Sequence, residues 1–138
     1  MTDNSAEKTL PEATLHHLRE LRGRLLRLHK TLLDMERADF ERDFGRLNSG
    51  ELLQLVINHA QFAWLRMISA LVVEIDEMLS AEEPATMKAA QNVIAQARSL
   101  VTSPADDEFG RKYQAALQRQ PEAVMAHAEV AKLLRQGS

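Results

Sequence analysis

The feature that most restricts the fold of this chain is a run of apolar residues separated by alternating steps of three and four positions. The run consists of Leu18, Leu21, Leu25, Leu28, Leu32 and Met35. This spacing places every member on one face of an α-helix, and Leu26, Leu33 and Phe40 form a second stripe beside it. The pattern predicts a helix over about residues 10–44, ended by Gly45, that is roughly 50 Å long and packs against more than one neighbour.

The rest of the chain also favours helices. It contains only five glycines and four prolines, and no segment sustains the alternation of apolar and polar residues that is typical of a strand. A helix-capping residue followed three positions later by Glu occurs at Thr9–Glu12, Asn48–Glu51 and Ser80–Glu83. Residues 51–80 form one helix or two, and the weaker helix formers Asn58 and His59 favour a break between them. Further helices are expected at residues 84–101, from Ser103 and Pro104 onward, and after Pro121.

The sequence therefore predicts an all-α fold, a helical bundle of five to six helices with a long N-terminal helix. A length of 138 residues suits a single domain with one core, so residues 1–138 are expected to form one bundle. Residues 1–9 are predicted to be a flexible N-terminal tail, and residues 136–138 a frayed C-terminus.

Composition excludes several classes of protein. The chain has no cysteine, so neither a disulfide framework nor a thiolate metal site is expected. The polar first ten residues differ from a secretory signal, and charged side chains interrupt the most apolar segment before it reaches membrane-spanning length. We therefore expect a cytoplasmic protein that does not bind membranes.

The charges are unevenly distributed along the chain. The net charge is −3, and residues 51–83 hold one basic and six acidic side chains. Residues 19–30 are instead basic, with Glu20 as their single acidic side chain. In an acidic protein, and without aromatic residues among the basic ones, such a run is typical of a solvated helix face. Nucleic acid is therefore not an expected partner.

The segment QFAWLRMISALVVEIDEML, residues 61–79, contains the only tryptophan of the chain. Projected at about 100° per residue, its largest apolar side chains share one broad face, and Arg66 and Glu77 fall opposite. In one interpretation these two are solvated and Asp76 pairs with a basic residue of the long first helix. In another, Phe62 and Val73, which lie outside the broad face, indicate that C-terminal helices or a second subunit cover this segment all round.

Under the second interpretation the segment supplies an interaction surface. Trp64 would anchor the core, Phe62 and Val73 would extend the apolar surface toward a partner, and Arg66 would mark its polar rim. Asp76 is the fifth residue predicted to belong to this interaction surface. Because a first helix of roughly 50 Å exceeds the length of the shorter helices, we expect a homodimer in which the first helix and the Trp64 helix contribute most of the contact.

A metal site is geometrically possible on the first helix. His16 and Glu20 are one turn apart and His17 is adjacent, which makes these three the candidate ligands. The sequence lacks paired Glu-x-x-His motifs, His-Glu-x-x-His, a phosphate-binding Gly-rich loop and Gly-x-Ser-x-Gly. We therefore expect no functional metal, no cofactor and no catalytic residue. His127, between two alanines, is expected to be a packed residue that donates a hydrogen bond.

Several segments resemble a family of small uncharacterised helical proteins found in bacteria. They are GELLQL, FAWLR, SALV and IDE, followed by YQAALQRQPEAVMAH near the C-terminus. Members of that family often have proline directly after the W-L-R triplet, where this chain has Met67. The resemblance implies a helix that begins near Trp64 after a break, and it implies no activity, ligand or functional residue.

Three functional classes are consistent with these patterns. A non-catalytic interaction or regulatory module that self-associates is favoured by the long first helix and the excess of apolar faces. A metal- or small-molecule-binding bundle is the alternative. A metal-free helical enzyme comes third, because arginines and carboxylates can form a pocket that no sequence motif reveals.

Overall fold

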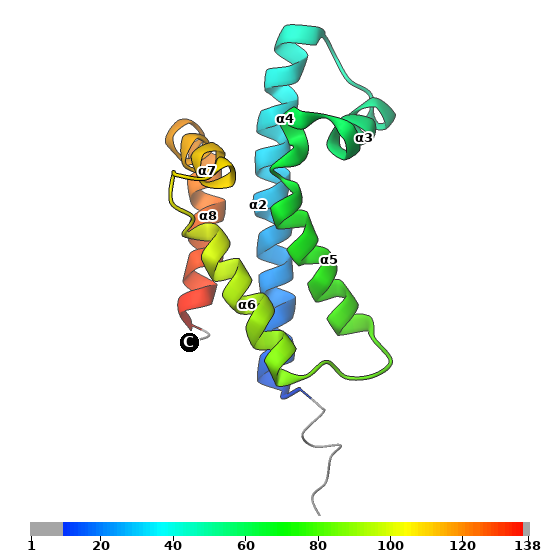
Figure 1. Cartoon of the computed structure of the whole chain (residues 1–138), viewed down its shortest axis with the longest axis vertical. Coiled ribbons are helices and arrows are strands. Elements are labelled where there is room, and N and C mark those ends of the chain that lie inside the picture. Colours follow the sequence, from blue (N-terminus) through cyan, green and yellow to red (C-terminus); the bar gives the residue numbers. More distant parts are fainter. Residues whose placement is uncertain (1–9, 137–138) are drawn as a thin grey trace, which may run out of the picture.

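The computed structural model of the chain describes residues 10–136 (Figure 1). Within this range the chain forms helices and no strand, which confirms the predicted all-α class and the long N-terminal helix. The helices are α2 (Glu12–Phe44), α3 (Ser49–Asn58), α4 (Ala60–Ala63), α5 (Arg66–Ser80), α6 (Met87–Val101), α7 (Glu108–Arg119) and α8 (Pro121–Gln136). The described range thus has seven helices, more than the five to six expected.

Helix α2 is the centre of the bundle. Helices α5 and α8 pack along it, α6 contacts both of them, and α7 packs on α8 (Figure 1). All six residues of its first apolar stripe are buried, and five of them are fully inaccessible. The prediction that a second subunit must cover this helix because of its length is therefore wrong for the stripe, since the other helices of the same chain cover it.

The ends of α2 differ in how closely the sequence predicted them. Gly45 ends the helix as expected, with a φ of 94° that favours glycine, and its N–H donates to the Glu41 carbonyl over 2.9 Å. At the other end the N-cap is Pro11, which makes no side-chain capping hydrogen bond. The expected cap Thr9 lies outside the described residues.

The segment from 51 to 80 breaks twice, which accounts for the larger number of helices. Asn48 forms the predicted capping box with Glu51, and α3 then ends at His59, whose extended backbone interrupts the helix. The His59 Nδ1 atom accepts a hydrogen bond from the Gln61 N–H and so begins α4. The second break, at Trp64 and Leu65, is a tight turn that keeps helical backbone angles, so the periodicity of the sequence did not reveal it.

Two other helices begin later than predicted. Helix α6 starts after Thr86, which caps the Ala89 N–H, and not at Pro84. Helix α7 starts after Asp107, which caps the Gly110 N–H, and not at Ser103. A β-carbon on Gly110 would lie 1.7 Å from the Pro104 carbonyl oxygen, so this glycine permits the close approach of the loop before α7.

The C-terminal helix starts at Pro121, where the sequence predicted an interruption, and extends through Gln136. The predictions for residues 1–9 and 137–138 fall outside the described range. Among the helices of residues 10–136, none combines the length and the apolar content that crossing a membrane requires.

Candidate functional site

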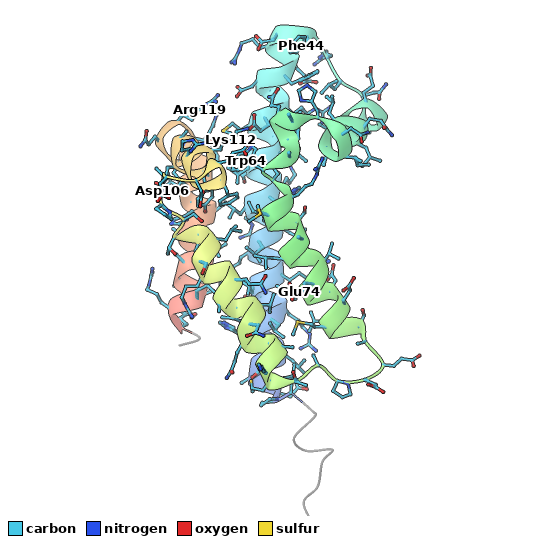
Figure 2. All side chains as sticks on the ribbon, in the orientation of Figure 1. Phe44, Trp64, Glu74, Asp106, Lys112 and Arg119 are labelled. Carbon is cyan, nitrogen blue, oxygen red and sulfur yellow. The ribbon has the colours of Figure 1, made fainter. Side chains whose placement is uncertain are left out.

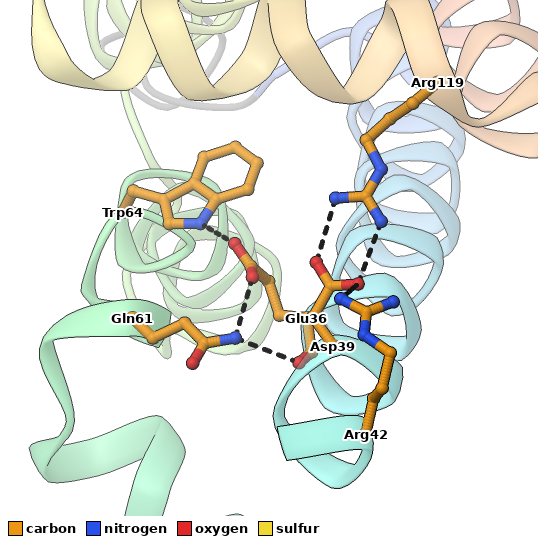
Figure 3. Close-up of polar contacts among 6 residues, drawn as sticks. All are labelled: Glu36, Asp39, Arg42, Gln61, Trp64 and Arg119. Carbon is orange, nitrogen blue, oxygen red and sulfur yellow. Dashed lines mark hydrogen bonds and ion pairs between the residues drawn. The ribbon is translucent and has the colours of Figure 1, made fainter.

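A buried carboxylate joins α2 to the turn between α4 and α5. Glu36 is only 9% exposed, and its Oε2 atom accepts a hydrogen bond from Trp64 Nε1 over 2.7 Å (Figure 3). The Gln61 side-chain amide donates both to Glu36 Oε1 and to the Glu36 carbonyl oxygen, each over 3.1 Å. Buried charge is tolerated only when it is hydrogen-bonded, so these donors fix the turn at Trp64 and with it the start of α5.

One turn further along α2, an ion pair fastens the end of α7. Both terminal nitrogens of Arg119 donate to the Asp39 carboxylate, over 2.8 and 2.9 Å, and Arg42 contacts the same carboxylate from the outside (Figure 3). The hydrogen bond from Arg119 holds the pKa of Asp39 below its ordinary value. A bidentate pair of this kind fixes orientation as well as distance, so α7 is held in register with α2.

Aromatic side chains continue this connection into the C-terminal helices. Trp64 contacts Phe109, whose ring stacks on Tyr113 at a centroid distance of 5.4 Å. The Tyr113 hydroxyl oxygen and His127 Nδ1 lie 2.7 Å apart. Burial raises the pKa of Tyr113 and lowers the pKa of His127, so this is a hydrogen bond between neutral groups. The packing and the hydrogen bond predicted for His127 are thus confirmed, and the tautomer of His127 determines which of the two groups donates.

A groove of about 750 Å³ lies between α5 and α6. Its floor is formed by Leu71 and Leu100, and Glu74 stands on its α5 side, where Figure 2 labels it. Small side chains occupy much of both walls and are too short to fill the space between the helices. The residues that line the groove are Ala63, Arg66, Met67, Ala70, Leu71, Glu74, Asn92, Ala95, Gln96, Ser99, Leu100 and Ser103.

Helix α3 stands beside the bundle (Figure 1), and polar contacts hold both of its ends. Before its first turn, the Leu47 N–H donates to Glu41 over 2.8 Å and the Leu47 carbonyl accepts from Arg37 over 2.7 Å. The hydrogen bond from Leu47 lowers the pKa of Glu41. At its last turn, Arg66 donates to the carbonyl oxygens of Val56 and Ile57.

Helix α3 packs only part of its aliphatic surface on the core, where Leu52, Leu55 and Val56 are partly buried. None of its ten residues is buried, and Leu53 and Ile57 are 56% and 52% exposed. Phe44, labelled at the end of α2 in Figure 2, is also exposed, and its ring contacts Phe40 at a centroid distance of 4.7 Å. Because Arg66 belongs both to the groove and to the anchor of α3, the two apolar surfaces adjoin.

The structure places two of the predicted interaction residues in the core of the chain itself. Trp64 is 4% exposed, in the anchoring position expected for it. Phe62 is fully inaccessible and packs near Phe40 and His59, at centroid distances of 6.2 Å from each. The prediction that Phe62 extends a surface toward a partner is therefore wrong, because the break at His59 turns its side chain inward.

The other three predicted residues lie at the surface of α5. Val73 is 54% exposed. Asp76 forms an ion pair with Arg22 of α2, as the first interpretation of this segment expected. Arg66 is exposed but not simply solvated, since it binds the last carbonyl groups of α3. Met67, which the sequence did not single out, is 54% exposed and lines the groove.

The metal candidates do not come together as a site. Among the described residues, no group of three or more His, Asp or Glu side chains is placed to hold a metal ion. Glu20 contacts Arg24 over 3.5 Å, and His16 is exposed. His17 is partly buried, and within the described range its Nε2 atom has no hydrogen-bond partner. Burial, followed by the nearby cation Arg98, lowers the pKa of His17.

Comparison with known proteins finds no match for this chain. No family model matches the chain, and no curated protein or solved structure is significantly similar to it. The resemblance to small bacterial helical proteins stays a prediction. The function must therefore be argued from the surfaces of the chain.

Proposed function

We propose that this protein is a non-catalytic interaction module that associates with itself as a homodimer. The observation that carries the proposal is the uncovered apolar surface formed by the α5–α6 groove and the adjoining helix α3. Contiguous apolar surfaces of this kind mark interaction sites, because burying them removes apolar area from water at about 25 cal/mol per Å². The module is proposed to act in the cytoplasm without a cofactor, a membrane or nucleic acid.

Sedimentation velocity over a dilution series tests the proposal. The wild-type chain is expected to be a dimer at tens of micromolar and to dissociate on dilution. Met67→Glu places a charge in the groove and should weaken the dimer, since an unpaired charge is costly to bury. Met125→Glu on α8 is the matched control, because Met125 is also exposed, at 70%. A wild-type monomer at every concentration would refute self-association.

A small-molecule-binding bundle is the second candidate. It rests on the groove volume of about 750 Å³, which lies within the roughly 300–1,000 Å³ that is usual for ligand pockets. Titration with an apolar fluorescent dye checks it. The dye should bind saturably at one site, and Ala70→Trp should abolish this binding. If the chain also remains monomeric, the result favours a small-molecule-binding bundle over the homodimer.

A further inference from the structure

Helix α3 is an apolar helix that packs one side on the core through Leu52, Leu55 and Val56 and leaves Leu53 and Ile57 exposed. Five of its ten residues are Leu, Val or Ile, and none of the ten is buried. An isolated helix of that length is marginal in water, and α3 is kept in place by the polar contacts at its ends and by its partly buried side chains. It is therefore presented in a fixed position, so docking would cost little further ordering of the backbone.

The α5–α6 groove matches α3 in length and in chemistry. Helix α3 is roughly 15 Å long, and the α5 side of the groove spans roughly 12 Å from Arg66 to Glu74 and is continued by Ala63 of α4. Leucines form the floor, and the alanines of the walls leave room for the larger side chains of a docked helix. Leu53 and Ile57 lie one turn apart on α3, so both can enter the groove together.

The groove cannot take the α3 of its own chain. Arg66 lines the groove and at the same time binds the last carbonyl groups of α3, which fixes α3 outside the groove of that chain. The α3 of a second copy has no such restriction. We infer that two copies associate about a two-fold axis, each placing its α3 in the α5–α6 groove of the other.

The size of the two surfaces supports the reciprocal arrangement. The groove is lined by twelve residues, and α3 has ten, of which Leu52, Leu55 and Val56 also pack partly on their own core, whereas a standard interface uses about 20–30 residues on each side. Neither surface alone reaches that size. In a two-fold pair each copy contributes both surfaces, so the contact is self-complementary and closed. This inference rests on the proposed function, because it names the surfaces through which the module self-associates.

Complementation between two variants tests the inference. The α3 variant is Leu53→Glu with Ile57→Glu, and the groove variant is Ala70→Glu with Ala95→Glu. All four positions are exposed in the single chain, so both variants should fold, as circular dichroism can check. Each variant alone should dimerise more than about tenfold more weakly than the wild type. Ala115→Glu with Ala128→Glu, at exposed positions of α7 and α8, is the control and should dimerise normally.

Mixing the two variants provides the decisive measurement. In a mixed pair, the intact α3 of the groove variant meets the intact groove of the α3 variant, so one of the two contacts is restored. Sedimentation should detect a mixed dimer at concentrations where each variant alone is monomeric. Failure of the mixture to associate, or a dimer that either variant leaves unaffected, would overturn the inference.

Cross-linking gives an independent test, because the chain has no natural cysteine. One chain carries Ile57→Cys and the other carries Ala70→Cys, with a tag that distinguishes them by size. Under mild oxidation the mixed disulfide should form faster than either disulfide between identical chains. Preferential joining of two Ile57→Cys chains would indicate an α3–α3 dimer and reject the groove. A wild-type monomer would instead refute the proposed function itself.

Discussion

The bundle around α2 and the helix α3 are stabilised in opposite ways. Helices α2, α5 and α8 bury their apolar stripes against one another, and the largest side chains there are inaccessible. Helix α3 has a comparable share of aliphatic residues but buries none of them fully, and polar contacts fix its ends. Apolar content alone therefore does not determine how deeply a helix enters the core, since α3 ends at the break at His59 and buries Leu52, Leu55 and Val56 only in part.

This difference predicts that the same chemical change will have unequal effects in the two regions. In the core, a substitution leaves a cavity or an unpaired charge, and the whole domain loses stability. In α3, it acts on a local equilibrium or on a partner surface, and the global free energy of unfolding should change little.

The largest effect is expected for Phe62→Asp. Phe62 is fully inaccessible, so the variant loses the packing of the ring and buries a carboxylate in an apolar site that was not built to donate hydrogen bonds to it. The cost should be about 4 kcal/mol or more, measured by urea denaturation. Val73→Asp is the matched control at an exposed position of the next helix, where a change within about 0.5 kcal/mol is expected. Equal stability of the two variants would contradict the inward orientation of Phe62.

Trp64→Ala should cost about 3–5 kcal/mol, because it leaves a cavity and removes the donor to Glu36. Trp64→Phe separates these contributions. It keeps a ring but leaves the carboxylate short of one hydrogen bond, at a cost of about 1–3 kcal/mol. Adding Glu36→Met removes the acceptor as well and should recover part of the loss. An equal cost of Trp64→Phe in the wild type and in the Glu36→Met background would show that the hydrogen bond matters little.

Asn48→Ala should act on α3 and leave the core unchanged. Asn48 and Glu51 form a reciprocal capping box over 2.8 and 3.0 Å, and its loss typically costs about 1 kcal/mol of helix stability. Amide hydrogen exchange should become faster throughout α3, whereas amides of α5 should keep their rates. Equal acceleration in both helices would mean that α3 unfolds only together with the core.

A smaller effect is expected from mild acid, and it should concern the core. Burial lowers the pKa of His17, His29 and His127 below the ordinary value of 6.5. The contribution of these histidines to the free energy of unfolding is therefore fully present above about pH 6.5. It decreases as the pH falls toward the lower pKa values of the folded state, because in that range the unfolded chain binds more protons than the folded chain. Urea denaturation between pH 7 and pH 5 measures this decrease in the free energy of unfolding. The triple variant with Gln at these positions should show a flatter profile, and a flat wild-type profile would contradict the prediction.

The sequence predicted best those features that depend on local order along the chain. The stripe from Leu18 to Met35 identified α2, and Gly45 and the Asn48–Glu51 pair marked real helix ends, because each acts within a few residues. The starts of α6 and α7 were misplaced because several residues could serve as caps. The sequence did not show which caps the structure uses, Thr86 and Asp107.

The candidate site was harder to predict because it depends on contacts between distant segments. Glu36 and Trp64 are 28 positions apart, and Asp39 and Arg119 are 80 apart. One signal could have revealed Glu36, since it lies four residues after Leu32 and so continues the apolar stripe with a charged side chain. The groove had no sequence signal, because it results from alanines that face each other on two helices.

The hydrogen bond between Trp64 and Glu36 also has a spectroscopic consequence. Trp64 is the only tryptophan, so all indole fluorescence of this protein arises at the turn that begins α5. Its Nε1–H donates to a carboxylate, and its ring is almost completely shielded from water. Any partner that shifts α5 while filling the groove would change the field around this one indole. Emission wavelength and quenching can therefore follow docking in the unlabelled chain.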